Sequence, residues 1–564
     1  MQPQLGNLTK ILFIICGSFI PYQWYATRLS DVSDWKLISV YVFLFALSLS
    51  AIVIFGLTQK HSLRLLYALL IAASALLVDS YREIMNEFFS YSAFVSLLQS
   101  NGFADDAVRH YGPHLTKPVI IAVLIFLGVA LPPSSSRQSH GPAKAPAKTL
   151  QVAVAAVPFL IIVMLALIGY VRGGSGMTGL PSGFMSFPYS SLLAIEFLQD
   201  DFGPRESVAQ SNQTLRFKAG YDIILIIDES VRGDYLDLNN PDGARTHLLD
   251  RPFTHHFGIA AAATNCSTGT NKILRFGGTR TAYRSHIETK PSIWDYAHAA
   301  GLRTVYVDGQ RTGGKLHNGM EPFELETIDE FIQFDGTPIV DRDIAIARTL
   351  ADLTRNQQSE LIVANKIGAH FPVHDKYPDD YMVHRPALPR GTFTSIADTG
   401  DRAGFGQWTE FINAYKNTLL WNVGHFFETL VAEADLEKSI IVYTPDHGQN
   451  FHEDGSAGLG LHCSARPSPF EGVVTTVVLT ENQTWHRQFI EWSGKNRDRT
   501  SHYNIFPTLL MLMGYETSKV TAVYGPTLVE PTNDPMTFNA EFFNARLGKQ
   551  GYWVGIEPAL ADRR

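Results

Sequence analysis

The sequence predicts a membrane-anchored α/β protein with a mostly parallel central sheet. Two observations predict it. Apolar segments crowd into the first 171 residues, and patterns of buried strands alternate with helical patterns through the rest of the 564-residue chain. We therefore expect a membrane domain over residues 1–171, a linker with a juxtamembrane helix over 172–216, and a globular domain over 217–564.

Five N-terminal segments are apolar enough to be membrane-spanning helices, since crossing a bilayer takes about 20 mostly apolar residues. They are Lys10–Ala26, Leu37–Leu57, Leu63–Val78, Pro118–Pro133 and Leu150–Val171. The second and fifth are the clearest, whereas the first and third could instead be core or interfacial helices. A cleaved signal peptide is not favoured for the first, because four further spans follow it and no small-residue cleavage site is evident.

Charged residues in the short connections predict the orientation of these spans. With the N-terminus in the cytoplasm, the inner segments carry Lys and Arg residues, among them Lys60 and Arg64, and no acidic residues. The outer loop Asp79–Lys117 carries five acidic residues against three basic ones. Five spans then place everything after Val171 on the outer side of the membrane.

The composition argues against nucleic acid as a partner and leaves undecided whether a disulfide forms. The net charge is −8, and no basic stripe interleaved with aromatic residues is present, so nucleic acid is not expected as a partner. Of the three cysteines, Cys16 falls in the first span. Cys266 and Cys463 are the pair that an oxidising outer compartment could bridge, and the sequence alone does not test that geometry.

Strand and helix patterns alternate through the globular region. The run Tyr221–Asp228 is continuously apolar and ends in an acid, as is typical of a buried parallel strand. Helix-then-strand pairs follow at 292–301 and 303–309, at 343–355 and 360–370, and at 406–434 and 439–448, with a strand at 473–480 and a helix at 502–514. Functional sites in such folds lie outside the carboxyl ends of the strands.

Side chains that can bind metals gather at these strand ends. They are Asp228 and Glu229 after the first strand, His370 after a middle strand, Asp446 and His447 after the strand SIIVYT, and His462 downstream. Taken singly, an Asp after a strand often only caps the next helix. Carboxylate together with imidazole, however, is the ligand set that suits Zn²⁺, with Mn²⁺ as a variant preferring harder oxygen ligands.

The stretch NCSTGT, Asn265–Thr270, places three hydroxyls ahead of a predicted helix that opens with NKILRF. Metal-assisted phosphoryl or sulfuryl transfer needs a nucleophile that loses its proton easily, and both a divalent cation and a helix N-terminus favour the resulting anion. A Thr or Ser in this stretch meets the requirement. The alternative is that Thr268 or Thr270 only caps the helix.

Together these motifs resemble the phosphoethanolamine transferases of lipid A and lipopolysaccharide, which belong to the alkaline phosphatase/sulfatase superfamily. The resemblance rests on a glutamate after the first soluble strand, Cys-x-x-x-Thr at a helix start, G-x-H after a middle strand, and D-H-G followed by L-H. Five spans ahead of a sulfatase-like α/β domain and the segment Thr500–Gly514 also match. The chain departs from the family pattern at Phe276, where a second cysteine often stands, and at Asp228, where a glycine often stands.

The resemblance implies a set of site residues. Thr270, four residues after Cys266, would be the nucleophile that becomes phosphorylated. The catalytic Zn²⁺ would be bound by Glu229, Thr270, Asp446 and His447, with one or two metals in the site. The donor phosphate would be contacted by His370, His462 and Lys315, and the two histidines are alternatively ligands of a second metal.

The resemblance also implies a reaction and a location. Phosphoethanolamine would pass from a membrane phospholipid, with phosphatidylethanolamine as the expected donor, through the threonine to a lipid or glycan of the cell surface. The enzyme would be a multi-pass protein of the bacterial inner membrane with its catalytic domain on the periplasmic side.

Other activities are weighed on the same residues. Sulfatase activity is disfavoured because Thr268 and Thr270 stand where the formylglycine motif needs Pro and Arg after Cys266. A phosphoglycerol transferase of the lipoteichoic-acid-synthase type is the closest rival, and a membrane-bound phosphodiesterase or phosphatase is another. A decayed module that only binds glycan or lipid is disfavoured, because all four residues of the implied Zn²⁺ set are present.

Overall fold

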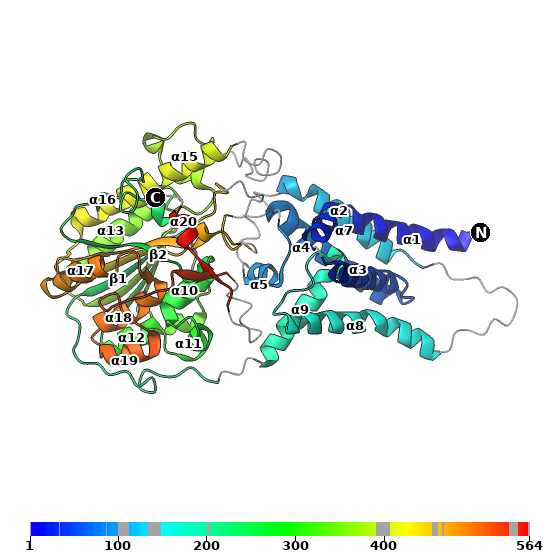
Figure 1. Ribbon diagram of the computed structural model, residues 1–564, viewed down its shortest axis with the longest axis horizontal. Coiled ribbons are helices and arrows are strands. Elements are labelled where there is room, and N and C mark those ends of the chain that lie inside the picture. The colour runs from blue at the N-terminus through cyan, green and yellow to red at the C-terminus, as the bar shows by residue number, and fades with distance from the viewer. Residues whose placement is uncertain are drawn as a thin grey trace. The chain divides into compact units, whose positions relative to one another are not determined.

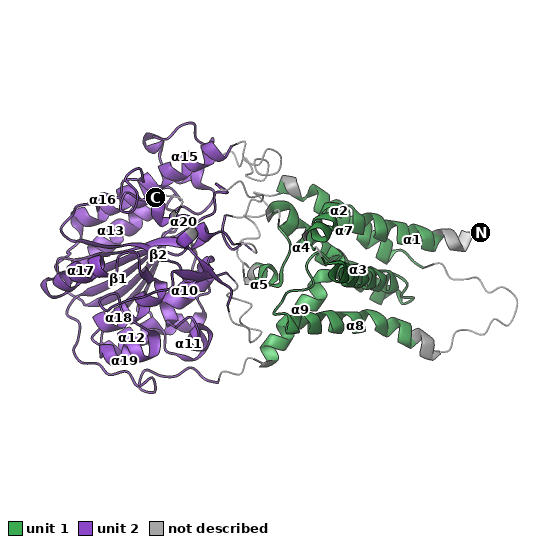
Figure 2. Ribbon diagram, viewed as in Figure 1, with its two compact units in different colours: residues 1–201, 543–549 green, residues 202–542, 550–564 purple. Residues whose placement is uncertain are grey.

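The computed structural model of the protein consists of two compact units. It describes residues 2–32, 34–85, 87–99, 112–133, 148–199, 203–390, 407–453, 461–464, 467–540 and 551–561. The first unit comprises residues 1–201 with 543–549, and the second comprises residues 202–542 with 550–564 (Figures 1 and 2). The boundary between the units therefore falls inside the region 172–216 that the sequence suggests as a linker.

The first unit is a bundle of mostly apolar helices. They are α1 (Gln2–Phe19), α2 (Tyr22–Asp31), α3 (Trp35–Gly56), α4 (His61–Met85), α5 (Tyr91–Gln99), α7 (Thr116–Ala130), α8 (Lys148–Val171) and α9 (Ser182–Gln199). Among the described residues, three helices are long and apolar enough to cross a membrane: Trp35–Gly56, His61–Ile84 and Val152–Val171. Gly6–Phe19 and Thr116–Ala130 are shorter apolar helices.

The predicted spans are thus matched in part. The first predicted segment, Lys10–Ala26, is not one continuous helix, because α1 ends at Phe19 and α2 begins after Pro21. Proline lacks the N–H that a continuing helix needs and clashes with the preceding turn. The loop Ser134–Thr149 falls almost wholly outside the described residues, as does part of the predicted outer loop Asp79–Lys117.

The second unit is built around an eight-stranded sheet. Its strands are β1 (Asp222–Asp228), β2 (Thr254–Ala261), β3 (Arg303–Asp308), β4 (Glu330–Gln333), β5 (Glu360–Asn365), β6 (Ser439–Pro445), β7 (Val473–Leu479) and β8 (Thr500–Ser501). They lie in the order β4-β3-β5-β1-β6-β7-β2-β8. Only the pairings of β7 with β6 and with β2 are antiparallel, so the predicted mostly parallel sheet is confirmed.

Helices cover both faces of this sheet. Along β1, Ile224 and Ile226 pack into one core with α13 (Arg342–Thr354), α15 (Trp408–Leu419) and α16 (Phe426–Glu433). The alternate β1 side chains pack into a second core with α12 (Ile293–Ala300), α17 (Gln483–Lys495) and α18 (Ile505–Leu512). Because both faces are covered, β1 can be apolar throughout, and this is why its pattern is readable from the sequence.

The remaining elements lie around the sheet. They are α10 (Ser267–Phe276), α11 (Tyr283–Thr289), α19 (Thr517–Tyr524), α20 (Glu557–Ala561), the short helical turn η4 (Val373–Asp375), and a two-stranded sheet of β9 (Thr537–Asn539) and β10 (Trp553–Gly555). Of these, α10 contains most of the stretch NCSTGT, so its anchoring decides where the hydroxyls of that stretch are placed.

A buried ion pair anchors α10. Nε of Arg275 donates to Oε2 of Glu324 at 2.7 Å, and the two side chains are 1% and 0% exposed. The same guanidinium also donates to the backbone oxygen of Asn318 at 3.3 Å. Together these bonds hold the C-terminal turn of α10.

Replacing Arg275 by Met should lower the free energy of unfolding by about 3–5 kcal/mol, because the Glu324 carboxylate would stay buried without its counter-ion. Thermal unfolding of the purified full chain measures the loss. Lys495→Met is the control: it breaks the exposed pair of Lys495 with Glu491 and should cost less than about 1 kcal/mol. Equal stability losses in the two variants would contradict the prediction.

Candidate active site

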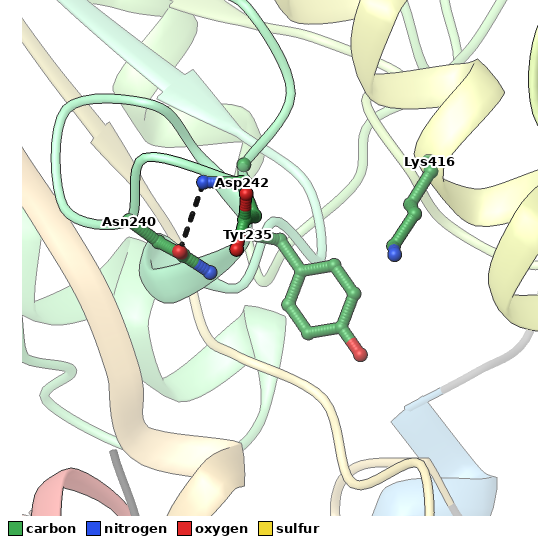
Figure 3. Close-up of a pocket in the computed structure, with 5 residues that line it drawn as sticks. Tyr235, Asn240, Asp242 and Lys416 are labelled. Atoms are coloured by element: carbon green, nitrogen blue, oxygen red, sulfur yellow. Dashed lines mark hydrogen bonds between the residues drawn. The ribbon is translucent and has the colours of Figure 1, made fainter. Parts of the chain in front are cut away.

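A surface pocket of the second unit does not hold the residues singled out by sequence. It is lined by Tyr235, Asn240, Asp242, Gly243 and Lys416 (Figure 3). The backbone N–H of Asp242 donates to Oδ1 of Asn240 at 3.1 Å, and the Lys416 ammonium lies 5.9 Å from the centre of the Tyr235 ring. The candidate site residues lie instead at the ends of the strands.

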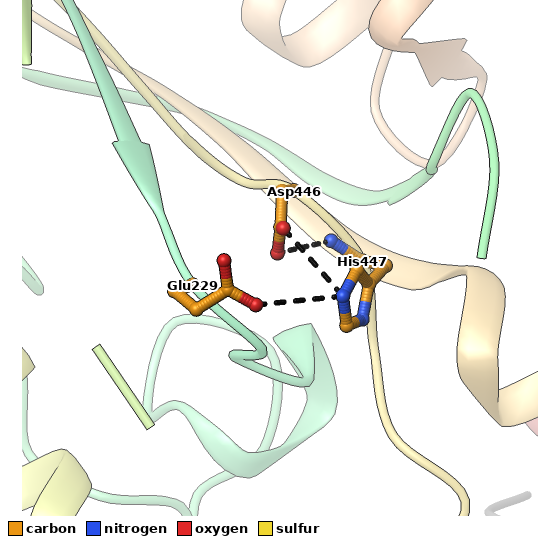
Figure 4. A group of neighbouring side chains, drawn as sticks. All are labelled: Glu229, Asp446 and His447. Carbon is orange, nitrogen blue, oxygen red and sulfur yellow. Dashed lines mark hydrogen bonds and ion pairs between the residues drawn. The ribbon is translucent and has the colours of Figure 1, made fainter. Parts of the chain in front are cut away.

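Three buried side chains meet where β1 and β6 end. Glu229 follows β1 directly, and Asp446 and His447 follow β6 (Figure 4). One ligand atom from each lies within 4.8 Å of those of the other two. Nε2 of His447 is 3.5 Å from both Oε1 of Glu229 and Oδ2 of Asp446. We call this group of side chains the carboxylate–histidine cluster. Its members meet because β1 and β6 pair in parallel with Asp228 opposite Pro445, so the residues that follow the two strands lie side by side.

The charges in the carboxylate–histidine cluster depend on one another. Burial and the charge of Glu229 raise the pKa of Asp446 to about 8. Burial opposes a charge on His447, but the Asp446 and Glu229 carboxylates outweigh it and raise the pKa of His447 to about 9. Against the cost of burial, the hydrogen bond with His447 holds the pKa of Glu229 well below its ordinary value. Two adjacent buried carboxylates repel each other, and a cation between them would relieve that repulsion.

The donor atoms of the cluster fit a divalent metal. Oδ2 of Asp446 is buried and, among the described residues, accepts no hydrogen bond, its one ion-pair contact being with His447, so it can bind a cation. Oδ1 of the same carboxylate accepts backbone N–H bonds from Ser230 at 2.9 Å and His447 at 2.7 Å. Oε2 of Glu229 accepts from Nε2 of Gln310 at 3.1 Å. Such supporting bonds orient metal-binding carboxylates, and Gln310 is a supporting residue that the sequence did not single out.

The hydroxyl of Ser267 contacts the carboxylate–histidine cluster. Its Oγ donates to Oε1 of Glu229 at 3.1 Å and lies 3.2 Å from Nε2 of His447. Ser267 is the first residue of α10, and the preceding Cys266 makes no side-chain capping bond. The unpaired N–H groups at this helix start favour negative charge near the Ser267 oxygen.

The hydroxyl of Thr270 has different partners. Thr270 lies three residues further along α10 and is fully buried. Its Oγ1 accepts from the backbone N–H of Thr264 at 3.2 Å and donates to the backbone oxygen of Thr264 at 3.3 Å. The sequence assigned the nucleophile and a metal-ligand role to Thr270. The helix begins earlier than expected, however, so the contact with Glu229 and His447 falls to Ser267.

His370 and His462 border the cluster, as their positions in the sequence suggest. The ring of His462 lies over that of His447, with centroids 4.4 Å apart and planes 27° apart. The His370 ring contacts His462 edge-on with centroids 5.9 Å apart. Burial lowers the pKa of both His370 and His462. Their role in contacting a donor phosphate remains a prediction.

Lys315 is exposed; its backbone oxygen accepts from Nε2 of Gln333 at 3.0 Å, and its backbone N–H donates to the backbone oxygen of Thr312 at 3.5 Å. Its contact with a donor phosphate thus stays a prediction from resemblance. Another lysine, Lys376, is 3% exposed, and burial lowers the pKa of its ammonium to about 8 against the opposing effect of the Asp343 and Glu229 carboxylates. Lys376 follows an irregular segment, so no strand or helix pattern draws attention to it.

A disulfide connects the two sides of the site. Cys266 and Cys463 are bonded, with Cα atoms 5.0 Å apart and a sequence separation of 197 residues. The bridge joins the residue before Ser267 to the residue after His462. The backbone N–H of Cys463 also donates to the backbone oxygen of Asn265 at 2.9 Å. The disulfide, which the sequence alone did not decide, therefore links the segments that carry Ser267 and His462.

Comparison with known proteins places this arrangement in a family. A family model described as Sulfatase matches residues 221–515, more than half of the chain. The chain belongs to the sulfatase family. None of the curated proteins matches the chain in sequence. The predicted superfamily is confirmed. The matched range includes the strand ends, α10 and every candidate site residue.

Solved structures with this fold include membrane proteins. One is the integral membrane protein lipooligosaccharide phosphoethanolamine transferase A from Neisseria meningitidis, with 17% identity and a TM-score of 0.66, covering 91% of this chain and 96% of that one. Another is the C-terminal periplasmic domain of EptC from Escherichia coli in complex with Zn, with 15% identity and a TM-score of 0.49, covering 61% of this chain and 95% of that one. At such identity the likeness to the neisserial protein shows that the fold is shared.

Replacing Asp446 by Asn should weaken zinc binding by more than about tenfold, because a ligand oxygen and a negative charge are removed together. Titration of the purified protein against a zinc-binding dye measures the affinity. Asp222→Asn is the matched control: Asp222 is a buried acid at the opposite end of β1, and its replacement should leave zinc affinity unchanged. An Asp446 variant with the affinity of the unaltered protein would remove Asp446 from the metal site.

Removing the disulfide by the double replacement Cys266→Ala, Cys463→Ala should destabilise the second unit by about 2–5 kcal/mol, because a long loop is no longer closed in the unfolded chain. Denaturant unfolding under non-reducing conditions measures the change. Cys16→Ser, which removes the free cysteine, should leave the transition unchanged. The same midpoint in all three proteins would speak against the bridge.

Proposed function

We propose that the protein is a metal-dependent transferase that moves phosphoethanolamine from a membrane phospholipid to a lipid or glycan of the cell surface. The observation that carries this proposal is the contact of the Ser267 hydroxyl, at the start of α10, with the buried carboxylate–histidine cluster. Membership of the sulfatase family and the fold shared with the neisserial phosphoethanolamine transferase support it.

Ser267 is the nucleophile in this proposal. In the first step Oγ of Ser267 bonds to the phosphorus of phosphatidylethanolamine, and the bond from phosphorus to the diacylglycerol oxygen breaks. The serine hydroxyl loses its proton, and the diacylglycerol oxygen takes one up. In the second step an oxygen of the acceptor attacks the phosphorus, the bond to Ser267 breaks, and the serine regains a proton. The intermediate is therefore a phosphoethanolamine ester of serine, in place of the threonine ester expected from the sequence.

Glu229, Asp446 and His447 would hold Zn²⁺, and their two carboxylates would also accept Mn²⁺. Bound there, the metal lowers the pKa of the attacking hydroxyl and screens the negative charge of the donor phosphate. The buried Oδ2 of Asp446, which accepts no hydrogen bond from the described residues, supports this assignment. His370 and His462, whose rings border the cluster, would contact the donor phosphate or bind a second metal.

The first unit would keep the enzyme at the source of its lipid donor. We propose five spans: the three long apolar helices together with the shorter Gly6–Phe19 and Thr116–Ala130. With the N-terminus inside, the second unit lies on the periplasmic side of a bacterial inner membrane. We retain the division into a membrane domain over 1–171, a linker with helix over 172–216 and a catalytic domain over 217–564.

Incubation with phosphatidylethanolamine vesicles should leave a phosphoethanolamine adduct on Ser267, which fragmentation mass spectrometry of the peptide distinguishes from one on Thr270. Ser267→Ala should abolish adduct and transfer, whereas Ser267→Thr keeps a hydroxyl and should retain part of both. Thr270→Ala, which removes the bonds to Thr264, should still transfer, with a stability loss of about 1–2 kcal/mol.

The mass and position of the adduct discriminate between the candidate functions. A phosphoglycerol adduct would replace the proposed donor by that of a lipoteichoic-acid-type enzyme. Release of free phosphoethanolamine without transfer would indicate a phosphodiesterase. An adduct on Thr270, or full transfer by Ser267→Ala, would return the nucleophile to the residue expected from the sequence.

A further inference from the structure

His502 is a fully buried histidine that contacts two segments of the candidate active site. It follows β8 directly in the chain and is 0% exposed. Its Nδ1 accepts the backbone N–H of Ala263 at 3.0 Å, and its Nε2 lies 2.9 Å from Oγ1 of Thr444. Ala263 precedes Ser267 by four residues, and Thr444 precedes Asp446 by two. One imidazole ring therefore contacts the chain just ahead of the proposed nucleophile and just ahead of a metal-binding carboxylate.

The hydrogen bonds of this ring define which nitrogen carries the hydrogen. A backbone N–H can only donate, so Nδ1 of His502 is the unprotonated nitrogen and Nε2 carries the hydrogen. Burial also lowers the pKa of His502 to about 3, which keeps the ring neutral at pH 7. Nε2 therefore donates to Oγ1 of Thr444, and that hydroxyl donates to the backbone oxygen of Thr475 at 2.9 Å. Both ring nitrogens are thus engaged, each with a different segment.

The backbone that carries the ring is itself fixed. His502 opens the short helical turn η8 (His502–Asn504), and the backbone N–H of Ser501 donates to Oδ1 of Asn504 at 2.9 Å. Strand β8 pairs with β2, with Ser501 opposite Ala261. The imidazole is therefore held at a defined place beside the end of β2.

The two segments that His502 contacts come from strands that do not pair with each other. Ala263 follows β2, and Thr444 belongs to β6. Strand β7 lies between these two strands in the sheet, so no ladder of backbone hydrogen bonds joins them. A side chain that only filled the core would need no bond to either strand. The His502 ring bonds to both and thereby joins them across β7.

We propose that His502 is a positioning residue that sets the place of the Ser267 hydroxyl relative to the Asp446 carboxylate. Through Nδ1 it holds the segment that leads from β2 into α10, and through Nε2 it holds the end of β6. The reaction that Ser267 performs is taken from the proposed function. The spacing of nucleophile and metal matters because a displacement of about 1 Å can lower a rate by about a hundredfold.

Two replacements of His502 separate its two contacts, because Asn offers an oxygen near the position of Nδ1 and Gln offers an N–H near that of Nε2. His502→Gln loses the bond to Ala263. It should leave zinc affinity unchanged and lower the rate of adduct formation on Ser267, per zinc-loaded full chain, by about tenfold or more. His502→Asn loses the bond to Thr444 and should weaken zinc binding by about tenfold.

His255 provides the matched control. It is a buried histidine on β2, 2% exposed, and its Nε2 lies 3.1 Å from Nδ1 of His486. His255→Gln and His255→Asn remove a buried imidazole without a contact to either segment, so zinc affinity and rate should match the unaltered protein. His502 variants that behave like these controls would overturn the proposal, since a histidine needed only for packing would act that way. Equal losses of both properties in His502→Gln and His502→Asn would also overturn it.

Replacement of Thr444 tests the same bond from its other end and covers the case in which the His502 variants do not fold. Thr444→Val keeps the shape and removes the hydroxyl, so it should weaken zinc binding by about tenfold, and Thr444→Ser should restore the affinity. Unaltered zinc affinity in Thr444→Val would overturn the inference. The zinc measurements do not depend on a donor. If no adduct forms on Ser267 in the unaltered protein, the proposed transfer fails while the link from His502 to the metal side is still tested.

Discussion

The pairing of β1 with β6 is the constraint on which the rest of the site depends. Its register brings Glu229 and Asp446, 217 residues apart in the chain, to the same edge of the sheet and buries both carboxylates. Burial, together with the charge of Glu229, raises the pKa of Asp446 to about 8. A bound cation would remove the repulsion between the two carboxylates. Metal binding would therefore raise the free energy of unfolding of the second unit.

The charged side chains next to this end of β1 form pairs of opposite charge. Asp228, one residue before Glu229, bonds to Lys366 and accepts from the Tyr443 hydroxyl at 2.9 Å. The departure from the family pattern at Asp228 therefore has a structural explanation: the carboxylate neutralises a buried lysine and does not join the metal group. Pairing opposite charges in this way lets an ionised region remain buried.

The sequence predicted those parts of the site that depend on local pattern. Apolar runs identify β1, β5 and β6, and the residues that follow them lead directly to Glu229 and to the Asp446–His447 pair. Strand β2 was missed, because His255 and His256 interrupt its apolar pattern. The resemblance implies Thr270 and not Ser267 as the nucleophile, and a shift of a few residues in where α10 begins decides which of these hydroxyls contacts the cluster.

The disulfide carries a consequence for when the protein becomes active. Cys266 and Cys463 are 197 residues apart in the chain, so the bond closes only after the chain has been synthesised beyond Cys463 and both thiols have reached a compartment that oxidises them. In the proposed topology that compartment is the one beyond the membrane. A chain still inside the cell would have Ser267 and His462 on unlinked segments. On that topology, formation of the disulfide, and with it the linkage of the segments carrying Ser267 and His462, would follow export.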